Sequence, residues 1–451
     1  MFVFDGPGEL GSPRLSRAAG GRHLPFDLHA LAAAALAMPT NDPAHTPYRG
    51  VTRRRADERP AERGGRSALG RWPGSAEDAV GWLRELLEHA IERALDGVKR
   101  VGVLAGGGLD SAAVLALACR WAERTGGSVF AVALDYEAAG DDRPHLRALE
   151  KHLACEVVRV PPEQAAARIA LIDGVDGAPF PWPTGPFEVE MLAVARAHGA
   201  ERSLSGAGGD ELFNGNPRSL AAHLRRGHLG RALGAARRLE GFDAPRSRIL
   251  SWLARPLVAA CQPASLRAWR SAYRPSSAPA WVGPAAHAFL RARDAIDPVG
   301  AHRDYVAWLR HQEMVASGAD LREPFFDADV MRMVGELPPE WLLHGDARRG
   351  LFREAMRGLL PESLRTRSDK ARFEPALARF FEAAGGAARL RPLAKLTRLV
   401  SLGIVSSSHS ASTFEAFAGD PREAEPWLAL WPALAVEAFL RASEHGTGAA
   451  P

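Results

Sequence analysis

The sequence predicts an α/β fold in which a parallel sheet carries helices on both faces and a mainly helical region follows. Short apolar runs begin at Arg100, Ser128 and Cys155, and each of the first two leads into a helical pattern. Runs that are apolar throughout, without polar alternation, are typical of parallel strands covered on both faces. Beyond about residue 218 this alternation stops, and helical patterns separated by Pro- and Gly-containing loops continue.

Local capping signals place the helices of the predicted sheet region. Ser75 precedes two acids and an apolar pattern of helical spacing, which predicts a helix that ends near Leu95. A second helix follows the glycines at 106–108 and ends at Gly126, and a third is expected at 144–154.

The first 75 residues are rich in Gly, Pro and Arg. The stretch RRRADERPAERGGR, residues 53–66, has the composition of a flexible charged connector. One helix is expected in this region, at 27–38.

The composition is that of an ordinary folded protein. The chain has 451 residues, of which 46% are hydrophobic and 24% charged, enough for two or three domains with cores of their own. The formal net charge is only +4, and the basic residues are nearly all arginine, so we expect no nucleic-acid partner. Lysine occurs only at positions 99, 151, 370 and 395.

Cysteine usage and hydropathy favour a cytoplasmic location. The three cysteines, Cys119, Cys155 and Cys261, form no C-x-x-C pair and no zinc-ligand spacing. The apolar run at 28–38 is too short to cross a bilayer and lacks a basic leader, so we expect no membrane partner.

The stretch LAGGGLDSA, which starts at Leu104, places three glycines between a predicted strand and a predicted helix. In open α/β sheets, ligands bind at the edge where the strands end, because the N-terminus of the following helix presents unpaired N–H groups to an anion there. Glycines at 106–108 would let the backbone approach phosphate oxygens, and Asp110 could hold magnesium. The stretch is neither a Walker loop nor a dinucleotide fingerprint. The alternative is a plain strand-to-helix turn in which Asp110 caps the helix.

A second cluster of glycines and acids, LSGAGGDELFNGNP at 204–217, follows another stretch that could be a strand. Plain turn chemistry gives little reason for Asp210 and Glu211 beside three glycines. Two carboxylates from different strand ends would suit the magnesium of a nucleoside triphosphate.

The two clusters and two later segments resemble the motifs of a known family. AGGGLDSA is similar to the pyrophosphate loop (PP-loop) of the N-type ATP pyrophosphatases, written S-G-G-x-D-S, and GAGGDELF resembles a signature of their asparagine synthetase branch. SGADLREPFFDADV, from Ser317, resembles the segment G-x-E-x-R-x-P-F-L-D, and RTRSDKARFEP, from Arg365, resembles R-x-K-x-x-F-x-x-P. The four motifs occur in the order typical of that branch.

The resemblance implies a division of the chain into three parts. Residues 1–75 would be a truncated N-terminal remnant and linker, 76–220 the PP-loop ATP-binding α/β core, and 221–451 a mainly helical synthetase region that completes the active site. The resemblance also implies ATP and Mg²⁺ as cofactors, with adenylation of a carboxylate followed by attack of an amine.

Three departures from the motifs stand out. The first serine of the loop is replaced by Ala105 and the second of its paired serines by Ala112, which predicts weaker ATP affinity, and the usual glutamate is Asp320. Asparagine synthetases resemble a fusion of a ligase half with a glutaminase half that uses an N-terminal cysteine. In this sequence residue 2 is Phe2, and no cysteine precedes Cys119. The amine is therefore expected from free ammonia, another subunit or the substrate.

Relatives without a working glutaminase include β-lactam synthetases and the cyclases that close the isopeptide ring of lasso peptides. The segments at 216–239 and 428–442 look more similar to the cyclases, which would imply a ribosomal precursor peptide as substrate, with a leader-binding protein and a protease as partners. An ammonia-dependent asparagine synthetase remains the main alternative, with a small carboxylate and an amine as substrates. An RNA-modifying ATP pyrophosphatase would not explain GAGGDELF, and Asp110, Ser111, Asp210 and Lys370 argue against an inactive scaffold.

The resemblance implies roles for individual residues. Asp110 and Asp210 would hold magnesium, while Ser111 and the amides of Gly106, Gly107 and Gly108 would hold pyrophosphate. Lys370, one of four lysines, would stabilise charge in the transition state, unless it is a surface lysine. Asp320 and Glu211 would act on the amine, or else pair with Arg322 or cap a helix. The nucleotide pocket would be formed by Leu104, Leu134 and Gly206, with Asp135 as a weaker candidate.

Overall fold

The computed structural model describes most of the chain, and the longest stretch outside the described residues is 231–281. The described residues are 2–20, 24–40, 42, 44–55, 74–137, 142–214, 227, 230, 282–292, 298–338, 341–342, 344, 349–367, 373–406 and 424–444. The expected connector at 53–66 lies outside them except for its first three residues. Among the described residues, no helix is both long and apolar enough to cross a membrane.

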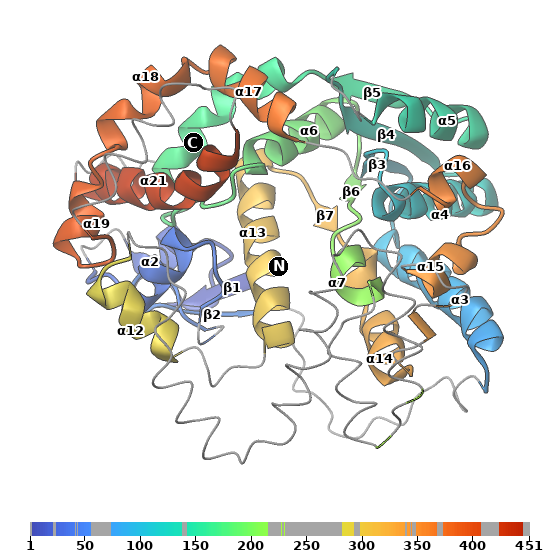
Figure 1. Cartoon of the computed structure of the whole chain (residues 1–451), viewed down its shortest axis with the longest axis horizontal. Coiled ribbons are helices and arrows are strands. Elements are labelled where there is room, and N and C mark those ends of the chain that lie inside the picture. Colours follow the sequence, from blue (N-terminus) through green and yellow to red (C-terminus); the bar gives the residue numbers. More distant parts are fainter. Residues whose placement is uncertain are drawn as a thin grey trace.

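A five-stranded parallel sheet forms the centre of the α/β half, as the sequence predicts (Figure 1). The strands lie in the order β5-β4-β3-β6-β7. Since all neighbours pair in parallel, the strands all end at one edge, called the carboxyl edge below. The strands are β3 (Arg100–Leu104), β4 (Ser128–Leu134), β5 (Val157–Val160), β6 (Arg202–Leu204) and β7 (Leu321–Arg322).

Helices cover both faces of this sheet, which confirms the predicted fold class. Val101 and Val103 point into a core shared with α3 (Ala76–Ala94) and α4 (Leu109–Thr125). Leu104 belongs to a separate core on the other face, with Leu192 of α6 (Gly185–Ala197). The alternation of β-strand side chains thus divides one strand between two cores.

The predicted helix boundaries in this half are confirmed by their caps. Ser75 accepts a hydrogen bond from the N–H of Asp78 at the start of α3, and Gly126 ends α4 in a left-handed conformation with a φ of 76°. Helix α5 (Arg143–Leu153) occupies the third predicted position.

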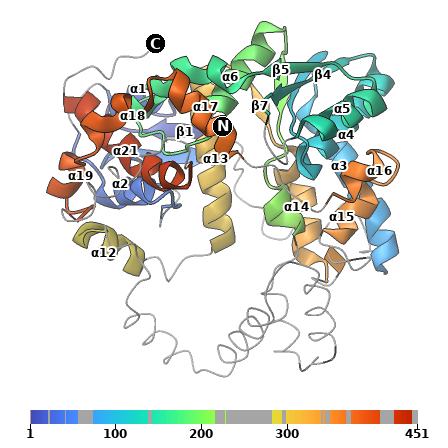
Figure 2. The same ribbon diagram turned by 45° about the horizontal axis from the view of Figure 1, so that its top comes forward.

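A second, helical half lies beyond α13 (Pro298–Ser317), which stands between the two halves in Figures 1 and 2. Its core contains Leu31 of α2 (Leu28–Ala35), Phe380 and Trp431, and Trp431 donates its indole N–H to the carbonyl of Phe180 at 3.2 Å. Asp27 caps α2, at the position where the sequence predicts a helix. The helices of this half include α12 (Pro284–Ala292), α17 (Glu374–Ala383), α18 (Gly386–Leu390), α19 (Thr397–Ser401), α21 (Ala424–Glu444) and the 3-10 helices η1 (Pro162–Asp173) and η5 (Arg391–Leu393).

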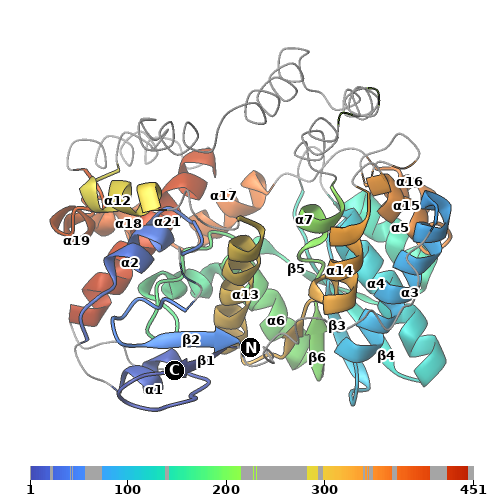
Figure 3. The same ribbon diagram turned by 90° about the horizontal axis from the view of Figure 1, so that it is seen from below.

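Two features of the fold were not predicted. Residues 2–5 and 52–55 form an antiparallel pair, β1 (Phe2–Asp5) and β2 (Thr52–Arg55), beside α1 (Leu15–Ala19) (Figure 3). Strand β7 comes from the region expected to be helical, and it joins the sheet at its edge. Three of the remaining short elements pack on α3: η3 (Pro324–Phe326), α14 (Ala328–Glu336) and α15 (Gly350–Ala355). Helix α7 (Gly209–Phe213) packs on α14, and α16 (Glu362–Arg365) packs on α5.

Candidate active site at the carboxyl edge of the sheet

The predicted pyrophosphate loop connects β3 to α4 at the carboxyl edge. The backbone N–H of Gly106 donates to Oγ of Ser111 at 2.9 Å, and this hydroxyl lies 3.2 Å from the carbonyl oxygen of Gly106. The Ser111 side chain therefore holds the start of the loop against the first turn of α4. None of the loop glycines at 106–108 is in the left-handed region. Their role is therefore to let other groups approach the loop backbone closely, and not to adopt an unusual backbone angle.

The second cluster packs directly on this loop. A Cβ atom at Gly206 would lie 2.6 Å from the backbone nitrogen of Ser111, and one at Gly209 would lie 2.3 Å from Cγ of Asp110. Both distances are too short for any side chain. Gly206 and Gly209 are thus explained by contact with the first cluster, and this contact brings Asp110 and Asp210 together.

Arg349 connects the two predicted magnesium ligands. Its Nη1 donates to Oδ1 of Asp110 at 2.8 Å, its Nη2 donates to Oδ1 of Asp210, and its Nε donates to Oδ1 of Asn214 at 2.9 Å. The Arg349 side chain is 8% exposed, and its backbone has a φ of 57°, which is costly for a residue other than glycine. Arg349 was not predicted from the sequence, because it lies in no recognised motif.

The chemistry of this pair of carboxylates fits a divalent cation. Asp110 and Asp210 converge on a single guanidinium, so they lie close enough to share a cation bound between them. Mg²⁺ prefers carboxylate oxygens and is usually held by one or two of them together with phosphate oxygens of the substrate. Among the described residues, no group of three or more His, Cys, Asp or Glu side chains could form a complete metal site. The pair therefore suits a metal that arrives with a nucleotide.

The predicted nucleotide-pocket residues also lie along the carboxyl edge. Leu104 and Leu134 are the last residues of β3 and β4, and Gly206 lies two residues beyond the end of β6. Asp135 is held by a hydrogen bond from its N–H to the carbonyl of Val160 at 2.8 Å. Its Oδ1 is buried without a hydrogen-bond partner in the described part of the chain, as expected for an acceptor that a ligand would satisfy.

Asp320 is not brought to this site. It precedes β7 at the amino edge of the sheet, where its carbonyl accepts from the N–H of Ser203 at 2.7 Å. Its carboxylate faces Nε of Arg202 at 2.8 Å and Nε of Arg322 at 3.1 Å. The structure thus shows the alternative pairing with Arg322, and this position gives no support to the predicted action of Asp320 on the amine.

Two further predicted residues have different outcomes. Glu211 is exposed in the first turn of α7, next to Asp210. Lys370 lies outside the described residues, so its role stays a prediction.

Glu323, at the carboxyl end of β7, was not predicted from the sequence. It pairs with Arg310 of α13 at 2.9 Å.

A comparison with protein-family models supports the sequence resemblance. Residues 82–441 match the model described as asparagine synthase. The chain belongs to this family. It is therefore an ATP-dependent ligase of the asparagine synthetase type, and its glycine and acid clusters both lie inside the matched range. A comparison with curated proteins gave no match.

Proposed function

We propose that this ligase closes a macrolactam or isopeptide ring in a ribosomal peptide, in the manner of the lasso peptide cyclases. A carboxylate of the peptide attacks the α-phosphorus of ATP, which forms an acyl-adenylate and releases pyrophosphate. An amine of the same peptide then attacks the acyl carbon, forms the amide bond and releases AMP and a proton. A leader-binding protein and a protease would deliver the peptide.

The convergence of the two glycine clusters on Asp110 and Asp210 is the observation that carries the adenylation step. Asp110 and Asp210 would hold magnesium, which neutralises charge on the departing pyrophosphate when bound. Ser111 and the loop amides would hold the pyrophosphate oxygens. Arg349, already placed between the two acids, adds a buried positive charge close to the same group. Lys370 would stabilise charge that develops during attack on the acyl group.

The two cysteines in the described part of the chain give no support to an amine released from glutamine, and Cys261 lies outside the described residues. Cys119 lies in α4 and Cys155 precedes β5, with Sγ of Cys155 3.5 Å from the carbonyl of Val129 at the amino edge of the sheet. A hydrogen bond to Cys155 and burial raise the pKa of the Cys119 thiol, which opposes its use as a nucleophile. Neither thiol is at the carboxyl edge, so neither is placed to release ammonia from glutamine beside the loop.

ATP–pyrophosphate exchange tests the proposal. The purified protein would be assayed with aspartate and with candidate precursor peptides, alongside Asp110→Asn and Lys370→Ala. Asp78→Asn, which changes an exposed acid at the start of α3, is a matched control for the loss of one carboxylate.

We expect exchange that depends on a peptide, is lost in Asp110→Asn and persists in Asp78→Asn. Exchange with aspartate alone would instead identify an ammonia-dependent asparagine synthetase. An absence of exchange with every acid, together with no ATP binding, would contradict adenylation and favour the inactive scaffold.

A further inference from the structure

Asp142 occupies a helix N-cap position but does not cap the helix. It precedes α5 with a φ of −84° and a ψ of −9°, and its side chain accepts no hydrogen bond from the first turn. Aspartate at this position normally accepts from the N–H groups of the next residues. Here the carboxylate is directed instead toward the pyrophosphate loop.

The loop glycines leave room for this carboxylate. A Cβ atom at Gly107 would lie 2.8 Å from Oδ1 of Asp142, and one at Gly106 would lie 3.1 Å from Oδ2. A side chain at either position would collide with the carboxylate or displace it. These two glycines are therefore matched to Asp142 as well as to a phosphate.

Arg367 joins Asp142 to the loop. Its Nη1 donates to the carbonyl oxygen of Gly107 and to Oδ1 of Asp142, both at 2.7 Å. The Arg367 side chain is 4% exposed and that of Asp142 is 13% exposed, so this ion pair is shielded from water. A loop that binds an anion must direct its N–H groups toward it and its carbonyl oxygens away from it. Arg367 holds one of these carbonyl oxygens, and it also neutralises an acid that would otherwise repel a triphosphate.

The backbone at Arg367 is itself fixed. Arg353 of α15 donates through Nη2 to the carbonyl of Arg367 at 2.7 Å, and through Nη1 to the carbonyl of Arg365. The segment that begins here carries Lys370 three residues later in the sequence. One arginine thus links the loop to the start of the segment that holds the predicted catalytic lysine.

We propose that Asp142 and Arg367 are positioning residues that set the phosphate-binding conformation of the pyrophosphate loop. Neither has to touch the reacting atoms, because Arg367 acts through the carbonyl of Gly107 and Asp142 acts through Arg367. The proposal rests on the adenylation step of the proposed function and does not depend on ring closure of a peptide. Its expected effect is confined to ligands that place phosphates on the loop.

Direct binding measurements separate this role from a general loss of structure. Titration calorimetry with magnesium pyrophosphate, Mg-ATP and AMP would be carried out on the unchanged chain, Asp142→Asn and Arg367→Met. We expect pyrophosphate and ATP to bind about tenfold or more weakly in both variants, since each loses a charge-assisted hydrogen bond near the loop, and AMP binding to be unchanged. Arg367→Lys keeps the charge and should recover part of the affinity.

Arg365→Met is the matched control. It makes the same substitution two residues earlier, at a buried arginine that pairs with Glu354 and Glu362 and donates to the carbonyl of Arg353 at 3.4 Å. It should bind pyrophosphate as the unchanged chain does.

Three outcomes would overturn the proposal. The first is pyrophosphate binding that is unchanged in Asp142→Asn and Arg367→Met. The second is a loss of AMP binding in these two variants as large as their loss of pyrophosphate binding. The third is a loss of pyrophosphate binding in Arg365→Met as large as that in Arg367→Met. If the unchanged chain bound neither ATP nor pyrophosphate, the loop would have no such ligand to position, and adenylation would fail with it. If ATP and pyrophosphate bind but no peptide supports exchange, only the cyclase proposal fails.

Discussion

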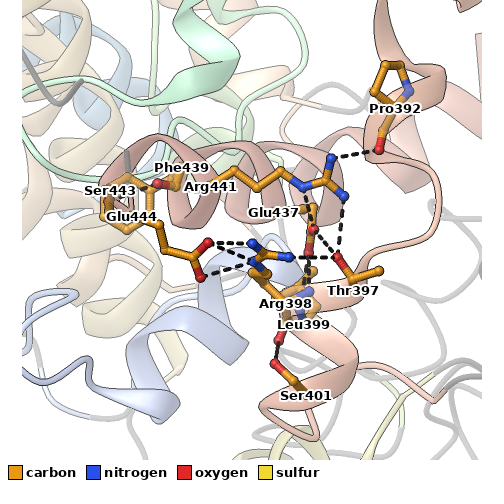
Figure 4. Close-up of polar contacts among 10 residues, drawn as sticks. All are labelled: Pro392, Thr397, Arg398, Leu399, Ser401, Glu437, Phe439, Arg441, Ser443 and Glu444. Atoms are coloured by element: carbon orange, nitrogen blue, oxygen red, sulfur yellow. Dashed lines mark hydrogen bonds and ion pairs between the residues drawn. The ribbon is translucent and has the colours of Figure 1, made fainter. Parts of the chain in front are cut away.

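Glu437→Gln should loosen the junction between α19 and α21. Glu437 lies in α21, and its side chain is 0% exposed. Its Oε2 accepts from the N–H groups of Arg398 and Leu399 at 2.9 and 3.1 Å, and its Oε1 accepts from Nε of Arg441 at 2.8 Å and from Oγ1 of Thr397 at 3.2 Å (Figure 4). One carboxylate thus satisfies the first turn of α19 and pairs with an arginine.

The magnitude follows from what glutamine cannot replace. Its amide nitrogen must face either the two backbone N–H groups or the donors of Arg441 and Thr397, so in either orientation two hydrogen bonds to a charged acceptor are lost. Each is worth about 1.5–3 kcal/mol. Arg441 is 27% exposed, so water replaces part of its loss, and we take about 3 kcal/mol, the lower end of the sum.

Hydrogen exchange followed by mass spectrometry measures this directly, because the amides of Arg398 and Leu399 are themselves the donors. A loss of about 3 kcal/mol should speed exchange in a peptide covering 397–401 by about 100-fold if local opening limits exchange. Glu444→Gln is the control, because Glu444 pairs with the side chain of Arg398 on the surface and is 49% exposed, so that pair should be worth about 1 kcal/mol or less. Equal exchange in Glu437→Gln and the unchanged chain would refute the reasoning.

Two further predictions concern the site and the stability of the fold. Gly209→Ala should lower ATP–pyrophosphate exchange by about 100-fold, because its Cβ would lie 2.3 Å from Cγ of Asp110 and would displace that carboxylate. Gly335→Ala in α14, where a Cβ meets nothing within 4 Å, should leave exchange unchanged, and equal activity of the two variants would contradict this reading. Burial lowers the pKa of His311 from 6.5 to about 3, so below pH 6.5 the unfolded chain binds a proton that the folded chain does not bind until about pH 3. The free energy of unfolding should therefore fall between these pH values by up to about 4 kcal/mol, and it should fall less in His311→Phe. Urea unfolding at pH 7, 5.5 and 4 measures both proteins. The same fall in both would show that His311 is not responsible.

Much of the fold could be predicted because its signals are local. Ser75 and Asp27 cap helices through N–H groups within three residues of themselves, and Gly126 ends α4 through its own backbone angle. The apolar runs of β3 and β4 are long enough to be recognised without their neighbours. Such signals act over one helical turn or one strand, which a sequence displays directly.

Strands that depend on a distant partner could not be found in this way. β1 and β2 have four residues each and pair across an intervening stretch of more than forty residues, so neither has a pattern of its own. β7 has two residues, and its pairing with β6 makes it a strand. In both cases the hydrogen bonds of a partner, and not local preference, decide the structure.

For the site, the sequence alone predicted which glycines and acids would carry the chemistry, and the tertiary structure decided how they are arranged. The glycines and acids of the two clusters predict phosphate and magnesium binding wherever they meet. Only packing shows that Gly209 is required by Asp110, that Arg349 bridges the two acids, and that Asp320 faces the opposite edge. Residue type fixes what a side chain can bind. Its neighbours at the site come from segments about a hundred or more positions away, and the packing of the whole core sets their approach.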